Sequence, residues 1–322
     1  MGQRVLVTGA SGFVGSAVAR GFASRGWQVA AAYRQRPALL PDGIEGFVVP
    51  DLLDAAGWHA ALRGVDAVVH CAARVHVMHE VLADPLQAFR AANVEGTALL
   101  ANAAQQAGAQ RFIFISSAKV NGESTSPGRP FRSDQVAHPV DPYAVSKFEA
   151  ETRLAEVSAR TGLRVTTIRP PLIYGPGVKA NFHKMMAWLH RGIPLPFARL
   201  ENRRSLLALS NLVDLIVCCA EHPAAANQTF LASDDEDLST TELLRRLGAA
   251  LHRPARLFSL PPGLVTLSAR LLGRKAALDR LYGSLQLDIT PTKTALGWRP
   301  PVTVNKALQK AADAFLSKQG AR

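Results

Sequence analysis

The sequence predicts a doubly wound α/β fold of the Rossmann type, a parallel sheet covered by helices, with a smaller C-terminal α/β substrate domain. Short apolar, β-branched runs alternate with longer Ala-rich helical patterns through the first half of the chain, as in parallel sheets with helices on both faces. A glycine-rich turn at 9–15 follows the first run and opens the first helical pattern. After Pro170, Pro-rich and Gly-rich loops separate shorter helices, which indicates a second region.

The individual elements follow from the same patterns. The first βαβ unit is expected to have strands over 4–8 and 27–33 around a helix over 12–25. Later strands are expected over 47–49, 67–71, 111–116, 165–168 and 206–209, with a helix over 88–106. We divide the chain into a first domain over 1–170, with a returning segment near 205–232, and a second, smaller domain over 171–204 and 233–322.

Composition and charge exclude several classes of protein. The 322 residues are 48% hydrophobic and 19% charged, a balance typical of globular proteins rather than disordered chains. The net charge of +12 comes from 37 Lys and Arg against 25 Asp and Glu. These cations are scattered and form no basic block, so we expect no nucleic-acid binding and interpret the excess as a surface that attracts an anionic small substrate.

Cysteine usage and hydropathy indicate a cytoplasmic protein. The three cysteines, Cys71, Cys218 and Cys219, form neither an even disulfide framework nor a C-x-x-C metal motif. The chain opens on a strand pattern rather than a secretory leader. The longest later apolar stretch, 206–220, is interrupted by polar residues and is too short to span a bilayer. No membrane insertion is therefore expected.

The glycine-rich turn predicts a dinucleotide site. Gly9, Gly12 and Gly15 stand at three-residue intervals between a strand and a helix. This arrangement allows a tight turn, a close approach of the backbone to a pyrophosphate, and close packing of helix on sheet. The first amides of the helix, at Phe13 and Val14, would face the phosphates.

The end of the second expected strand bears on the choice of cofactor. NAD enzymes commonly place an acid there to bind the ribose 2′-hydroxyl, but the segment 31–36 has none. Arg34 can instead pair with the 2′-phosphate of NADP(H), the expected cofactor, with NAD(H) as the alternative. Arg34 and Arg36 could also be plain surface charges. Asp51 would meet the adenine end, unless it only forms a turn.

Three side chains suggest proton transfer to and from an oxygen of the substrate. Tyr143 and Lys147 lie four residues apart on one helix face, where an ammonium would lower the phenol pKa from its reference value of about 10. Ser117, at a strand end, could donate a hydrogen bond to a carbonyl oxygen. The alternatives are an amphipathic helix with a packed Tyr143 and a Ser117 that merely caps its strand.

The order of these motifs resembles the extended short-chain dehydrogenases, the NAD-dependent epimerase/dehydratase family, over nearly the whole chain. UDP-galactose 4-epimerase and dTDP-glucose 4,6-dehydratase belong to this family. The resemblance implies a Rossmann domain, a smaller substrate domain and a homodimer formed through two helices per subunit. It rests on the following segments: Thr8 to Gly15, Asp51-Leu52, His70 to Ala73, Asn93 to Thr97, Ser116-Ser117, Tyr143 to Lys147 and Arg169-Pro170.

The resemblance also implies roles for single residues. Ser117, Tyr143 and Lys147 match the catalytic set of the family. Among the cofactor contacts that it implies, Ala72 would lie at the nicotinamide ribose, Pro170 at the nicotinamide, and Asn93 would order the cofactor and the lysine. The remaining contacts, beyond the glycine turn and Arg34, are Asp51, Leu52, Tyr143 and Lys147.

The substrate implied is a nucleotide-diphosphate sugar. Asn181 and Arg204 match positions that contact the diphosphate, and Arg280 lies near a second such position. Ser117 and Lys119 complete the expected substrate-binding set. Arg203 and Arg204 could equally be surface charges. No metal is expected, because two histidines and a glutamate, His76, His79 and Glu80, lack a converging further ligand.

Departures from the family pattern narrow the expected reaction. A 4,6-dehydratase places an Asp-Glu pair directly after its active-site hydroxyl residue, where this chain has Ala118 and Lys119. Dehydration is therefore not expected. The absence of an acid near Arg34 favours exchangeable NADPH and net reduction, whereas 4-epimerases hold NAD tightly.

We therefore expect NADPH-dependent reduction of the C4 keto group of a nucleotide sugar. The segments 74–79 and 119–123 resemble bacterial reductases of UDP-4-keto-6-deoxy-HexNAc, which make UDP-N-acetylquinovosamine for surface polysaccharides such as O-antigen. The alternatives are a UDP-hexose or UDP-HexNAc 4-epimerase with tightly bound NAD, and a non-catalytic nucleotide-binding module.

Overall fold

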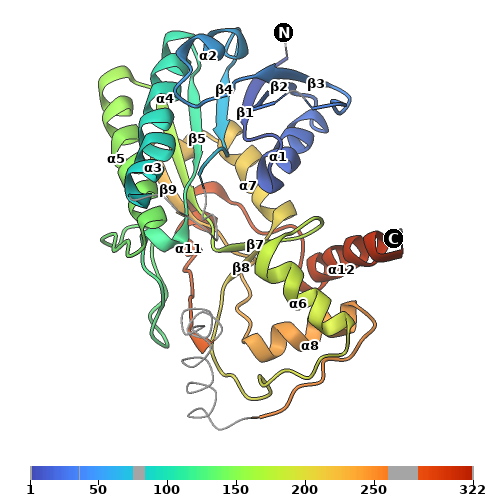
Figure 1. The fold of residues 1–322 in the computed structure, drawn as a ribbon. Helices are drawn as coiled ribbons and strands as arrows, with labels where there is room; N and C mark the ends of the chain where they lie inside the picture. The colour runs from blue at the N-terminus through green and yellow to red at the C-terminus, as the bar shows by residue number, and fades with distance from the viewer. Residues whose placement is uncertain (1, 36, 75–83, 260–281, 321–322) are drawn as a thin grey trace.

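A single parallel sheet of seven strands forms the upper part of the molecule (Figure 1). The computed structural model describes residues 2–35, 37–74, 84–259 and 282–320. The strand order is β3-β2-β1-β4-β5-β6-β9, which confirms the predicted doubly wound α/β fold. The strands are β1 Arg4–Thr8, β2 Gln28–Tyr33, β3 Ile44–Val48, β4 Ala67–His70, β5 Arg111–Ile115, β6 Arg164–Arg169 and β9 Gln228–Leu231.

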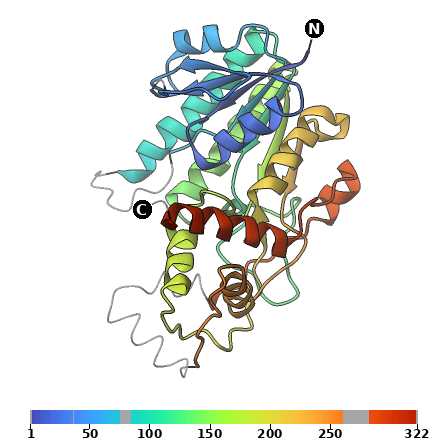
Figure 2. The same cartoon turned by 90° about the vertical axis from the view of Figure 1, so that its right-hand side faces the viewer.

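Helices cover both faces of this sheet (Figures 1 and 2). On β1, Val5 and Val7 face one apolar core while Leu6 faces the other, which is why the strand is a continuous apolar run rather than an alternating one. The first core is closed by α1 Phe13–Ala23 and α7 Leu209–Glu221, and the second by α2 Ala55–Ala61, α4 Gly96–Gln106 and α5 Pro142–Thr161.

The segment between β4 and β5 differs from the single helix predicted over 88–106. It consists of α3 Pro85–Arg90, a turn of π-helix η1 Ala91–Glu95, and α4. Within η1, the backbone oxygen of Asn93 accepts a hydrogen bond from Thr97 Oγ1 at 2.6 Å. The turn is widened because Gly96 N donates to the oxygen of Ala91, five residues earlier, and such π-turns are frequent at functional sites.

A smaller region lies beyond the carboxyl ends of the strands (Figure 1). Its strands β7 Leu172–Tyr174 and β8 Leu206–Ala208 pair in parallel. Its helices α6 Ala180–His190, α8 Thr240–Ala250 and α12 Val304–Gly320 enclose a third core that includes Phe182, Leu244 and Phe315. Shorter elements are η2 Ala118–Val120, η3 Pro223–Ala225 and α11 Thr290–Leu296. Among the described helices, none combines the length and apolarity needed to cross a membrane.

Candidate active site

The candidate site lies at the carboxyl edge of the sheet, where parallel strands bring their following loops together. The loop after β1 lies directly against the loop after β4. The approach is so close that a Cβ atom added to Gly9 would lie 2.8 Å from the backbone nitrogen of Ala72. The loop after β5 meets the end of β6 through a hydrogen bond of 2.9 Å from Ala118 N to the oxygen of Pro170. Residues from four strands, far apart in sequence, therefore line one edge.

The glycine turn has the geometry that a dinucleotide diphosphate requires. Gly9 has φ of +65°, and a Cβ at Gly15 would lie only 2.2 Å from the backbone oxygen of Gly9. Gly12 caps α1 without a side-chain hydrogen bond, so the amides of Phe13 and Val14 are left for an anion. The turn and helix end therefore fit the phosphates of a nicotinamide dinucleotide.

The end of β2 offers a cation to the adenosine part of such a cofactor. Tyr33 is buried, whereas Arg34 is exposed and makes no hydrogen bond or ion pair with another described residue. Asp51 has the turn-forming role left open by the sequence, since its Oδ1 accepts from Leu53 N at 3.0 Å. Its neighbour Leu52 packs against Gly96 of α4.

A buried chain of hydrogen bonds joins the ends of β1 and β4 to α4. Ala72 N donates to Thr8 Oγ1 at 3.1 Å, and Thr8 Oγ1 lies 2.7 Å from Nδ1 of His70. On the other side of the ring, His70 Nε2 lies 3.0 Å from Thr97 Oγ1, which donates to the oxygen of Asn93. The hydroxyl proton of Thr97 is already donated to Asn93, so Thr97 Oγ1 can only accept from His70. The ring proton of His70 must therefore lie on Nε2, and Nδ1 accepts from the hydroxyl of Thr8.

Asn93 continues this chain of hydrogen bonds to α5. Its Oδ1 accepts from Arg74 N at 2.8 Å, and its Nδ2 donates to Ser146 Oγ at 3.0 Å. Ser146 Oγ in turn donates to the oxygen of Tyr143 at 2.8 Å. Asn93 therefore orders the backbone around Tyr143. His70, for which the sequence predicted no separate role, is linked to Asn93 through the Thr97 hydroxyl.

We expect His70 to make the fold sensitive to acid. Burial, and then the ammonium of Lys147, lower the pKa of His70 from its ordinary 6.5 to about 3. The unfolded chain therefore binds the extra proton first, and stability should fall from pH 6.5 towards pH 3 by about 1.4 kcal/mol per pH unit from this group. In urea unfolding across that range, His70→Gln should show a shallower loss than wild type. Equal slopes would contradict this expectation.

The three predicted catalytic residues stand on two adjacent elements at this edge. Ser117 caps η2, and its Oγ accepts from Lys119 N at 3.2 Å. Tyr143 lies in the first turn of α5, next to the edge of the Phe89 ring. Lys147, one turn later, is only 1% exposed and holds its Nζ 4.0 Å from the centroid of the Phe114 ring.

The expected lowering of the Tyr143 pKa by Lys147 is wrong for this structure. Burial, and then the charge of Asp141, raise the pKa of Tyr143 to about 12. Burial lowers the pKa of Lys147 to about 7, against the opposing effects of Glu151 and Cys71. The ammonium that was to favour the phenolate is itself disfavoured, because its place over Phe114 excludes water.

A buried ion pair lies directly behind these residues and was missed by the sequence analysis. Arg169 Nη2 lies 2.5 Å from Glu151 Oε2, with the two side chains 7% and 9% exposed. Ser116 Oγ donates to Glu151 Oε1 at 2.5 Å, and Arg169 also donates to Asn121 Oδ1. No local spacing in the sequence indicates this contact, because Glu151 lies on α5 and Arg169 at the end of β6.

The predicted substrate residues are not gathered in the same way. Lys119 forms ion pairs with Asp141 and Glu123, so both carboxylates already bind its ammonium. Asn181 is exposed in the first turn of α6. Arg204 donates to the oxygen of Gly283 at 2.8 Å. Arg280 lies outside the described residues. So do His76, His79 and Glu80, at which the sequence predicted no metal site.

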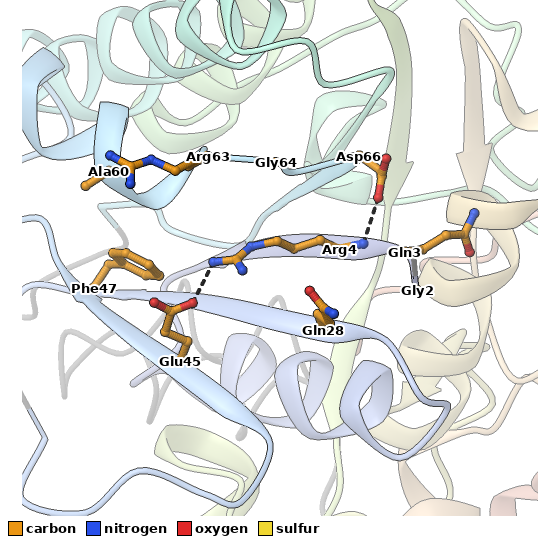
Figure 3. A pocket seen from close by; sticks show the side chains of 10 residues that line it. All are labelled: Gly2, Gln3, Arg4, Gln28, Glu45, Phe47, Ala60, Arg63, Gly64 and Asp66. Atoms are coloured by element: carbon orange, nitrogen blue, oxygen red, sulfur yellow. Dashed lines mark hydrogen bonds and ion pairs between the residues drawn. The ribbon is translucent and has the colours of Figure 1, made fainter.

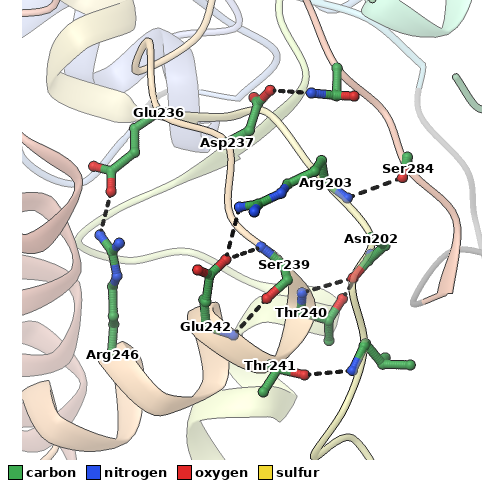
Figure 4. Close-up of polar contacts among 12 residues, drawn as sticks. Asn202, Arg203, Glu236, Asp237, Ser239, Thr240, Thr241, Glu242, Arg246 and Ser284 are labelled. Atoms are coloured by element: carbon green, nitrogen blue, oxygen red, sulfur yellow. Dashed lines mark hydrogen bonds and ion pairs between the residues drawn. The ribbon is translucent and has the colours of Figure 1, made fainter. Parts of the chain in front are cut away.

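The segment that carries Arg203 and Arg204 is held by the start of α8 (Figure 4). Ser239 and Glu242 form a capping box there, and Glu242 also accepts from the Arg203 guanidinium at 3.3 Å. Asn202 binds both the amide and the hydroxyl of Thr240. These contacts fix the backbone of the segment and engage the Arg203 side chain as a structural charge.

A separate cavity of about 720 Å³ lies at the opposite, amino-terminal edge of the sheet (Figure 3). Its arginine Arg4 pairs with Glu45 at 2.6 Å, and the backbone nitrogen of Arg4 donates to Asp66. The Nε of Arg4, by contrast, is buried without a hydrogen-bond partner among the described residues. None of the predicted site residues lines it, so it is not part of the candidate site.

Comparison with known proteins identifies the family. The model of the "NAD dependent epimerase/dehydratase family" matches residues 5–232. The chain belongs to this family. A UDP-glucose 4-epimerase of Vibrio cholerae is 43% identical over 317 residues, covering 98% of this chain and 96% of that protein. A 3 beta-hydroxysteroid dehydrogenase/Delta 5-->4-isomerase of Mycobacterium tuberculosis is 29% identical over 340 residues, covering 98% and 90%.

Solved structures extend the likeness to the fold. A UDP-glucuronic acid 4-epimerase from Bacillus cereus in complex with NAD superposes with a TM-score of 0.80 at 20% identity, covering 99% of each chain. At that identity the likeness bears on the fold alone. The family assignment confirms the resemblance found in the motifs, whereas the comparisons do not show the reductase type predicted from the sequence.

Proposed function

We propose that the protein is a nucleotide-sugar 4-epimerase, acting on a UDP-hexose or UDP-HexNAc through oxidation and reduction at C4. The observation that carries this proposal is the 43% identity, along almost the whole chain, to a protein named UDP-glucose 4-epimerase. This identity supports the 4-epimerase, the alternative expected from the sequence, more than the 4-ketoreductase. The site supports chemistry at C4 in either case, because Ser117 and Tyr143 flank one sheet edge beside Lys147.

Each half-reaction requires one proton transfer at the C4 oxygen. When bound, the nicotinamide dinucleotide supplies the acceptor and donor of hydride. Tyr143 would take the proton from the C4 hydroxyl during oxidation and return it during reduction. Ser117 would donate a hydrogen bond that orients this oxygen. Lys147 is buried one helical turn from Tyr143. Whenever its amine is protonated, Lys147 would place a cation beside the phenol.

The second candidate is the NADPH-dependent 4-ketoreductase. It is favoured by the end of β2, where Arg34 is exposed and unpaired among the described residues and no acid is present over 31–36. An arginine there suits a 2′-phosphate, since its planar fork donates two hydrogen bonds to one anion. A reductase that exchanges its cofactor in every turnover would gain from this preference for NADP(H).

One set of assays separates the two candidates. The purified protein is given UDP-glucose or UDP-GlcNAc, and the formation of the galacto epimer is measured. In parallel it is given UDP-2-acetamido-2,6-dideoxy-4-hexulose with NADPH or NADH, and the loss of the reduced cofactor is measured. Interconversion without net cofactor consumption supports the epimerase. Stoichiometric oxidation of NADPH without interconversion overturns it in favour of the reductase. A protein that does neither overturns both candidates.

The preference for NADP(H) can be tested independently of the sugar. Arg34→Ala should weaken NADPH binding about 10- to 100-fold and leave NADH binding nearly unchanged, because only NADPH offers the 2′-phosphate to the guanidinium. Isothermal titration or fluorescence of the reduced nicotinamide measures both constants. Arg63→Ala, an exposed arginine at the opposite edge, is the matched control. Equal losses for both cofactors would refute the assignment of Arg34.

We also propose a homodimer and a division into two domains. The domains would be those assigned from the sequence, 1–170 with the segment near 205–232, and 171–204 with 233–322.

The dimer would form through α4 and α5, which lie side by side over one face of the sheet (Figure 1). α5 carries the exposed Phe148. Light scattering of wild type and of Phe148→Glu tests the dimer, because the charged variant should be monomeric.

A further inference from the structure

We propose that Lys119 is a positioning residue that holds the Ser117 turn against the Tyr143 helix and offsets the negative charge of Asp141 beside the Tyr143 phenol. This inference rests on the proposed role of Tyr143 in C4 chemistry. It replaces the sequence expectation that Lys119 binds the substrate.

Lys119 contacts both catalytic segments. Its backbone nitrogen donates to Ser117 Oγ at 3.2 Å, while its ammonium binds the carboxylate of Asp141. Asp141 is the N-cap of α5, and its other oxygen accepts from Ala144 N at 2.7 Å. One residue therefore links the hydroxyl of Ser117 to the helical turn on which Tyr143 stands.

A second carboxylate fixes the ammonium in place. Glu123 Oε1 lies 2.9 Å from Lys119 Nζ, and the Lys119 side chain is 27% exposed. Two carboxylates around one ammonium leave it little attraction for a further anion such as a diphosphate. They also restrict its rotamers, so that the bond to Asp141 persists. A positioning role therefore fits Lys119 better than substrate binding.

The charges around Tyr143 explain why this pairing affects the proton on its phenol. Asp141, at the N-cap, disfavours the phenolate and contributes to the raised pKa of Tyr143. Lys119, from the turn after β5, neutralises that carboxylate, and Glu123 partly offsets Lys119. Lys147 is the cation of α5 itself. From α3, Arg90 is already paired with Glu149 of α5 at 2.6 Å.

The test uses two substitutions of opposite sign. Lys119→Met leaves the Asp141 charge uncompensated and should move the acid limb of the pH–rate profile upwards by about one pH unit. Asp141→Asn removes that charge while keeping a good N-cap, and should move the same limb downwards by a similar amount. The first measurement is kcat against pH, in whichever C4 assay wild type supports. The second needs no activity: tyrosinate absorbance is titrated against pH, and the titration of Tyr143→Phe is subtracted to isolate the signal of Tyr143.

Matched variants separate this role from a loss of stability. Lys119→Arg keeps the cation and should restore the wild-type profile. Arg153→Met removes a cation from an exposed pair with Glu156 farther along α5 and should leave the limb in place. Shifts of opposite sign in Lys119→Met and Asp141→Asn support the inference, and an unmoved limb in both overturns it.

The two proposals fail in different ways. If wild type catalyses neither C4 reaction, the proposed function fails, and the absorbance titration alone decides whether Lys119 and Asp141 control the Tyr143 proton. If wild type is active but both variants titrate as wild type does, the proposed function stands and the role of Lys119 is wrong.

Discussion

Replacing Tyr143 by phenylalanine is expected to lower turnover at C4 by about two to four orders of magnitude. In the proposed mechanism the phenol is the proton donor and acceptor at C4, and Phe retains the ring that packs against Phe89 while removing the hydroxyl. A pKa of about 12 for Tyr143 makes the phenol a ready donor to an alkoxide but a reluctant base at neutral pH. The sugar-oxidising half-reaction should therefore limit the wild-type rate at low pH.

The binding of cofactor separates this effect from general damage. Tyr143→Phe should bind the nicotinamide dinucleotide within about threefold of wild type, because the glycine turn and Arg34 are untouched. Tyr282→Phe is the matched control, since its ring packs against Phe197 in the smaller region and should retain turnover. Near-normal turnover in Tyr143→Phe would remove Tyr143 from the mechanism and leave the family fold without its expected proton donor.

Local spacing explains what could be predicted from the sequence. Gly9, Gly12 and Gly15 need only a strand before them and a helix after them to form a phosphate turn. Tyr143 and Lys147 need only a helix to share a face. The parallel sheet then brings these local motifs to one edge, because all of its strands end there. The fold and this edge were therefore predictable.

Contacts over long sequence distances could not be predicted in this way. The buried pair of Glu151 and Arg169 joins α5 to β6, and the ring of His70 joins β1 to α4. Nor does spacing reveal burial, so the place of Lys147 over Phe114 and the resulting pKa values came only from the structure. The charged partners of Lys119 likewise lie 4 and 22 residues away, and they changed its expected role.

Breaking the buried pair behind the site should have the largest effect on stability. Glu151→Gln leaves the Arg169 guanidinium buried without a countercharge, and we expect it to lower the free energy of unfolding by about 3–5 kcal/mol. Urea unfolding at fixed protein concentration measures this. Glu149→Gln is the matched control on the same helix, because its partner Arg90 is 47% exposed and a solvent-screened surface pair contributes little to stability.

A double apolar replacement distinguishes stability from positioning. Glu151→Met with Arg169→Met removes both charges, so most of the stability lost in Glu151→Gln should return. Turnover should not return with it, because the Glu151 carboxylate also raises the pKa of Lys147 against the effect of burial. Without that carboxylate, Lys147 should be largely neutral at pH 7 and the pH optimum should move down. If the double variant regained both stability and wild-type turnover, the ion pair would be a packing feature with no part in setting the charge of Lys147.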